Sequence, residues 1–70
     1  MVERTFTAVI HKEDDLFVAE CTEIGTVSQG KSIEDAIANL TEATELYLEE
    51  FSIPNTRPAF LTTFEVALRA

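Results

Sequence analysis

Apolar and polar residues alternate in the first part of the chain, as in β-strands with one buried face. The stretch 5–11 places three apolar residues on one side of an extended backbone, namely Phe6, Ala8 and Ile10. After a short polar break comes a second apolar run, Leu16–Cys21. The two runs predict an antiparallel hairpin. A third strand is predicted at 26–30, which is rich in β-branched residues and ends in glycine.

The apolar spacing changes to that of a helix after Ser32. The Ser32 hydroxyl can accept a hydrogen bond from a free backbone N–H group at the start of the helix. Asp35, three residues later, completes a Ser-x-x-acid capping pattern. The spacing predicts a helix over 33–50, about 27 Å long. Its inward stripe comprises Ile33, Ile37, Leu40, Thr44, Tyr47 and Phe51, widened by Ala36, Ala43 and Leu48. Its outward acids are Glu34, Glu42, Glu45 and Glu49.

The end of the chain returns to the alternation of a strand. Two prolines place a loop at 52–58, because proline fits neither a helix interior nor a central strand. In the stretch 62–68, Phe64, Val66 and Leu68 share one side, which predicts a fourth strand. The predicted fold is α+β, in the order β-β-β-α-β, within a single domain covering 1–70. We expect a mainly antiparallel sheet with one long helix packed on one face.

The size and composition predict a small folded protein. The chain has 70 residues, of which 46% are hydrophobic. A domain of this length buries only about 60% of its unfolded surface, so we expect further support from homo-oligomers, either dimers or tetramers. One cysteine, Cys21, and one histidine make neither an intrachain disulfide nor a zinc site. No apolar run approaches the roughly 20 residues of a membrane span, and no export signal is visible, so we expect a cytoplasmic protein.

The negative charge is concentrated in the middle of the chain. The net charge is −8, and residues 13–50 hold 11 of the 13 carboxylates with Lys31 as their one basic residue, a local net of −10. Nucleic acid would be repelled by such a surface. A basic protein partner would suit it.

One segment, Gly25–Ser32, matches the phosphate-loop pattern G-x-x-x-x-G-K-S/T. A working loop wraps phosphates with backbone N–H groups. Thr26 and Val27 are β-branched and prefer extended backbone instead. The fold that carries this loop also needs a parallel sheet with crossover helices, which a chain with one helix cannot supply. We therefore favour a strand that leads into a capped helix, and expect no nucleotide-binding residues.

The sequence offers few other candidates for a catalytic or metal-binding site. Four carboxylates lie close in sequence around the predicted hairpin, and two-metal nucleases use such groups. These are Asp14, Asp15, Glu20 and Glu23. A solvated acidic face or a protein-binding surface are the alternatives. His11 has no nucleophile nearby in sequence, and the acidic neighbours of Cys21 disfavour a reactive thiolate, so we interpret Cys21 as a small packing residue. We expect no catalytic residues, no metal, no cofactor and no enzymatic activity.

The residue pattern resembles the HicB antitoxin family. The resemblance rests on Phe17–Cys21, on Val27–Ala36, and on the helix body from Asn39 to Glu50 with its Leu-Tyr-Leu-Glu run. It implies a partial ribonuclease H-like fold without that enzyme's catalytic carboxylates. It also implies a role in neutralising HicA, a small basic mRNA-cleaving toxin. Many members carry an additional DNA-binding module, and none follows here, so we expect no direct nucleic-acid binding by this chain alone.

The leading hypothesis is therefore an antitoxin-type binding module. The candidate partner-binding residues are Asp14, Asp15, Glu20 and Glu23, with the outward helix acids Glu42, Glu45 and Glu49 as an alternative set. The competing hypothesis is an oligomeric scaffold or regulatory domain with no toxin partner.

Overall fold

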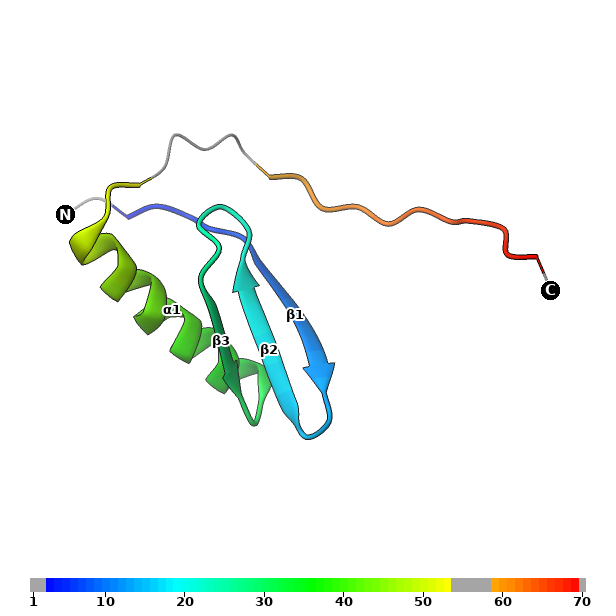
Figure 1. Cartoon of the computed structure of the whole chain (residues 1–70), viewed down its shortest axis with the longest axis horizontal. Helices are drawn as coiled ribbons and strands as arrows, with labels where there is room; N and C mark the ends of the chain where they lie inside the picture. The colour runs from blue at the N-terminus through cyan, green and yellow to red at the C-terminus, as the bar shows by residue number, and fades with distance from the viewer. Residues whose placement is uncertain (1–2, 54–58, 70) are drawn as a thin grey trace.

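The computed structural model describes residues 3–53 and 59–69, and it contains three strands followed by one helix (Figure 1). The elements are β1 (Ala8–Glu13), β2 (Leu16–Cys21), β3 (Val27–Gly30) and α1 (Ile33–Glu50). The strands form one antiparallel sheet in the order β1-β2-β3, and α1 packs against β3 and β2. The predicted α+β class and the order β-β-β-α are confirmed.

A tight hairpin joins β1 to β2. The strands pair from Ala8 opposite Cys21 to Glu13 opposite Leu16, which leaves a turn of two residues. Asp14 adopts a left-handed backbone with φ 53°, a conformation that aspartate tolerates better than most residues. The first strand starts and ends later than predicted, because pairing with all of β2 continues up to this short turn.

Three of the four buried hydrophobic residues in the described parts of the chain are small. Ala19 and Cys21 of β2 pack against Ala36 and Leu40 of α1, and all four are buried. Partly buried side chains surround them, namely Phe6, Ala8, Ile10, Phe17 and Ile24. The small side chains let the helix approach the sheet closely.

The N-terminus of α1 is capped by Ser32, as its sequence predicts. The Ser32 Oγ accepts the Asp35 backbone N–H at 3.0 Å. At the other end, the Phe51 N–H donates to the Tyr47 carbonyl at 2.9 Å, and the two rings stack with centroids 4.8 Å apart. The predicted limits of the helix are therefore confirmed.

The inward stripe of α1 is covered only in part. Leu40 and Thr44 are buried, but Ile33, Ile37 and Phe51 remain 42–54% exposed. The prediction that these three residues belong to the core is wrong for the single chain. The helix lies over β3 and β2, and no strand of the described residues extends far enough to cover its other side.

The strand predicted at 62–68 is not formed. Residues 59–69 carry no secondary structure and run away from the sheet as an extended chain (Figure 1). A strand needs a neighbour for its backbone hydrogen bonds, and no other part of residues 3–53 pairs with this segment. The loop predicted at 52–58 falls mostly on 54–58, which lie outside the described residues.

Candidate functional site

The four carboxylates predicted to form a partner surface do not gather at one place. Asp14 and Asp15 form the β1–β2 turn, whereas Glu23 lies in the loop after β2, at the other end of that strand (Figure 1). Six residues of strand separate these ends by about 20 Å. Glu20 lies between them on the exposed face of the sheet, opposite Val9 and Val27. Among residues 3–53 and 59–69, no three His, Cys, Asp or Glu side chains are grouped so that they could hold a metal ion.

Glu23 has a structural role that its sequence position does not reveal. Its carboxylate accepts the backbone N–H and the hydroxyl of Thr7, both at 2.8 Å, and the hydroxyl of Thr22 at 3.1 Å. The hydrogen bond from the Thr7 N–H is the largest cause that lowers the pKa of Glu23 from 4.5 to about 2. The carboxylate thus ties the residue before β1 to the loop after β2. Thr7 and Glu23 are 16 positions apart, so no local motif predicts the contact.

The lowered pKa of Glu23 predicts acid sensitivity of the fold. A carboxylate with a depressed folded-state pKa stabilises the fold fully above pH 4.5, and this contribution is lost as the pH falls through about 2. Urea unfolding at pH 7, 4 and 2.5 measures how the free energy of unfolding changes with pH. Glu23→Gln is expected to lower stability at pH 7 and to flatten its decline with acid. Glu20→Gln, an exposed carboxylate of β2, is the matched control and should keep the wild-type profile. Equal pH profiles for wild type and Glu23→Gln would contradict the assignment.

Two exposed acidic surfaces remain available to a partner. The hairpin acids are Glu13, Asp14 and Asp15, which are all exposed at one end of the sheet. The helix acids are Glu42, Glu45 and Glu49, which are exposed and spaced three and four residues apart, so they share one face of α1. His11 stands beside the hairpin acids, with its Nε2 3.4 Å from the Glu13 carboxylate, and is itself exposed.

The phosphate-loop match does not correspond to a phosphate loop in space. The segment between its glycines is largely strand β3, with extended backbone, and the Ser32 hydroxyl caps α1. Gly30 is needed for packing, since a Cβ there would lie 2.6 Å from the Ala36 backbone nitrogen. The interpretation of a strand leading into a capped helix is confirmed. The interpretation of Cys21 as a packing residue is confirmed too, because it is 2% exposed within the core.

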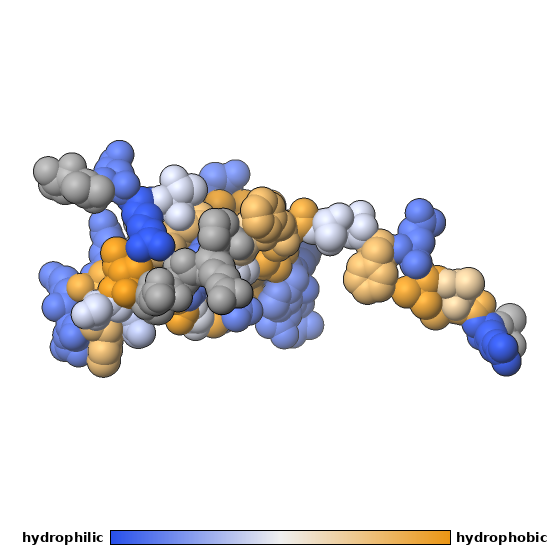
Figure 2. Space-filling view, turned by 90° about the horizontal axis from the view of Figure 1, so that it is seen from above, coloured by the Kyte–Doolittle hydropathy of each residue, from blue (hydrophilic) through white to orange (hydrophobic). Residues whose placement is uncertain are grey.

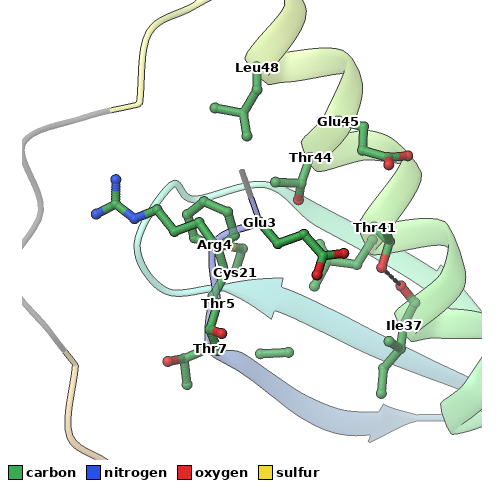
Figure 3. A pocket seen from close by; sticks show the side chains of 13 residues that line it. Glu3, Arg4, Thr5, Thr7, Cys21, Ile37, Thr41, Thr44, Glu45 and Leu48 are labelled. Atoms are coloured by element: carbon green, nitrogen blue, oxygen red, sulfur yellow. Dashed lines mark hydrogen bonds between the residues drawn. The ribbon is translucent and has the colours of Figure 1, made fainter. Parts of the chain in front are cut away.

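A groove of about 590 Å³ runs between α1 and the beginning of the chain (Figure 3). Ile37, Thr44 and Leu48 line its helix side, and Phe6 and Ala8 line the side of the sheet. The sequence reasoning missed this groove, because the stripe on α1 predicts a filled core there. The lining also includes polar and charged residues, namely Glu3, Arg4, Thr5, Thr7, Thr41 and Glu45, so apolar and polar side chains share this groove.

The exposed carboxylates and this groove belong to a small acidic α+β fold. A UPF0150 protein of Helicobacter pylori strain J99 is 36% identical to the chain over 66 residues, a match that covers 86% of this chain and 92% of the relative. The chain belongs to the UPF0150 family. No protein-family model and no solved structure gives a significant match. In the part of the chain that the structure describes, no helix has the length and hydrophobicity required to cross a membrane.

Proposed function

We propose that this protein is a non-enzymatic, antitoxin-type binding module that holds a small basic HicA-like mRNA-cleaving toxin inactive by direct protein–protein contact. The observation that carries the proposal is the local net charge of −10 over residues 13–50, displayed as exposed carboxylates on the hairpin and on α1. The resemblance of Phe17–Cys21 and Val27–Ala36 to the HicB antitoxin family supports the same function. The toxin would be the partner, and no bond is made or broken by the chain itself.

The proposed mechanism is competition for the basic side chains of the toxin. A ribonuclease needs lysine and arginine to hold the phosphates of its RNA, and exposed carboxylates attract the same groups. Complementary charge chiefly speeds association and selects the partner, whereas buried apolar contacts supply much of the affinity. The bound domain would also cover the catalytic site of the toxin sterically.

The carboxylates differ in how available they are for contact with a basic partner. The Glu23 carboxylate is already engaged by Thr7, so among the four predicted residues Asp14 and Asp15 are the more available. They project from a two-residue turn whose backbone is fixed by the hairpin, which keeps their charges at a defined place. We therefore take Asp14 and Asp15 as the first candidate contact, and the helix acids as the second.

Charge reversal distinguishes the two surfaces. The double variant Asp14→Lys/Asp15→Lys is compared with Glu42→Lys/Glu45→Lys, which changes the same number of charges on α1. Reversal of the contacting pair is expected to slow association with the toxin by roughly tenfold or more at low salt, and to reduce its salt dependence. Stopped-flow association at two salt concentrations measures both effects. Unchanged association rates for both double variants would contradict the electrostatic mechanism.

A scaffold or regulatory domain without a toxin is the second candidate. The exposed apolar segment at 59–69 favours it, because such a segment suits self-association. The genomic neighbourhood separates the two functions. A short, strongly basic reading frame beside this one, whose product co-purifies with the chain on co-expression, supports the toxin partner. The absence of such a frame supports the scaffold.

A further inference from the structure

The face of the sheet that points away from α1 is uncovered. Ala19 and Cys21 of β2 turn toward the helix, so the alternating side chains point the other way. We call this side the outer face; it comprises every second residue of β1 from Val9, of β2 from Leu16 and of β3 from Val27. Among residues 3–53 and 59–69, α1 is the only helix. The segment 59–69 runs away from the sheet (Figure 1), and Figure 2 shows its far end clear of the rest of the molecule.

Glu20 stands at the centre of the outer face between two valines. The register places Val9 on one side of it and Val27 on the other. Side chains directly opposite on neighbouring strands have Cβ atoms about 4.5–5.5 Å apart, so both valines stand beside the carboxylate. Val9 is 41% exposed and Val27 is 56% exposed. No ion pair or hydrogen bond between described residues engages the Glu20 side chain, which therefore offers a charged acceptor between two apolar walls.

The outer face carries negative charge at both of its ends as well. Glu13 lies at the hairpin end, and Glu23 borders the other end through its hydrogen bond with the Thr7 hydroxyl. The only lysine or arginine of the three strands is Lys12. Its Nζ lies 5.8 Å from the centre of the Phe17 ring, which packs against the core, so Lys12 belongs to the helix side of the sheet. A cationic side chain that approaches the outer face is therefore attracted along its whole length.

Arginine fits the surroundings of Glu20 better than lysine does. A planar guanidinium can donate two parallel hydrogen bonds to one carboxylate, and the methylene stem of arginine packs on apolar surface such as the two valines. The ammonium of lysine is more strongly hydrated and lacks this paired geometry. A central charge pair surrounded by apolar contacts that exclude water is the arrangement of an interface hot spot.

The backbone at Glu20 is fixed before any partner arrives. β2 is the central strand, and Glu20 lies in register with both β1 and β3. A side chain on such a backbone loses little freedom on binding, which favours affinity. The helix acids Glu42, Glu45 and Glu49 lie on a single element and have no such neighbour on either side.

From these features we infer that the basic partner docks on the outer face and seats an arginine on Glu20, between Val9 and Val27. This rests on the proposed function and names the surface of the chain that performs it. Asp14 and Asp15 then lie at the rim of the contact, since the strand from Glu20 to Leu16 alone spans about 13 Å. Rim charges chiefly speed the encounter, whereas a central pair chiefly slows dissociation.

Two matched pairs of variants test the docking surface. Glu20→Gln removes one charge from the outer face, and Glu34→Gln removes one from the exposed start of α1. Val27→Lys places a cation beside Glu20, and Leu46→Lys places one on the helix at a position of similar exposure, 58% against 56%. The probe is the purified product of the short basic reading frame expected beside this one, and calorimetry measures its affinity. We expect binding about tenfold weaker for Glu20→Gln, about 100-fold weaker for Val27→Lys, and nearly unchanged for both helix variants.

Methyl NMR of the unaltered chain gives a second measurement that needs no variant. On addition of the same basic protein, the methyl signals of Val9 and Val27 should shift, while those of Leu46 should stay in place. All four substituted positions are exposed, so the helical circular dichroism signal should persist in every variant.

The outcomes separate the docking surface from the function. Binding that resists both Glu20→Gln and Val27→Lys, or that is lost in Leu46→Lys instead, overturns the outer face as the docking surface and leaves the antitoxin function standing. A chain that does not bind the basic protein at all overturns the proposed function and the docking surface together. Weaker binding confined to the two outer-face variants supports both.

Discussion

Leu40→Ala is expected to lower the free energy of unfolding by about 2–5 kcal/mol, the range for truncating a buried leucine. Leu40 is 6% exposed, and the other buried hydrophobic residues are Ala19, Cys21 and Ala36. It is therefore the one large side chain among the buried hydrophobic residues of 3–53 and 59–69, and no other bulky buried residue of these ranges can fill the space it leaves. Because small domains have only about 5–15 kcal/mol of stability, the variant should be substantially unfolded at modest urea concentrations.

The matched control for this truncation is Leu46→Ala on the same helix. Leu46 is 58% exposed, so the same chemical change removes little buried surface there. Urea titrations followed by circular dichroism at 222 nm compare the two. Equal losses at both positions would mean that the contact between α1 and the sheet is not where the structure has it.

Gly30→Ala is expected to destabilise the fold by about 3 kcal/mol or more, beyond the usual cost of overpacking. A Cβ at Gly30 would lie 2.6 Å from the Ala36 nitrogen and 2.7–2.8 Å from the Cβ and carbonyl carbon of Asp35. Two of these three atoms belong to the helix backbone, so no side-chain rotation relieves the contact. The first turn of α1 would have to separate from β3.

Gly25→Ala provides the comparison, because the same methyl group meets open space there. Its cost comes only from the positive φ of 93°, about 1–2 kcal/mol. Thermal unfolding should therefore rank wild type above Gly25→Ala, and Gly25→Ala above Gly30→Ala. A tolerated Gly30→Ala would contradict the close approach of β3 and α1.

The helix and the central strand could be predicted from sequence because their signals are local. Ser32 and Asp35 mark the start of α1, the apolar spacing carries it to Glu50, and Leu16–Cys21 is β2 with the predicted limits. Each of these signals acts within a few residues, so no distant partner is needed to specify it.

The candidate site was less predictable because it depends on distant partners. Asp14 and Glu23 are close in sequence, yet the intervening strand carries them to opposite ends of the sheet. The contact of Glu23 with Thr7 exists only through the register of the hairpin. The alternation of apolar and polar residues at 62–68 indicates that the segment can form a strand. It does not indicate which edge of a sheet that strand would join.

The most direct test of the proposed function is an RNA-cleavage titration with the purified product of the short basic reading frame that the proposal expects beside this one. We expect cleavage to fall in proportion to added chain and to cease near equal stoichiometry, while the chain alone cleaves nothing. Cleavage that persists in excess chain, despite a correctly folded domain, would contradict the proposal that this acidic module neutralises a toxin.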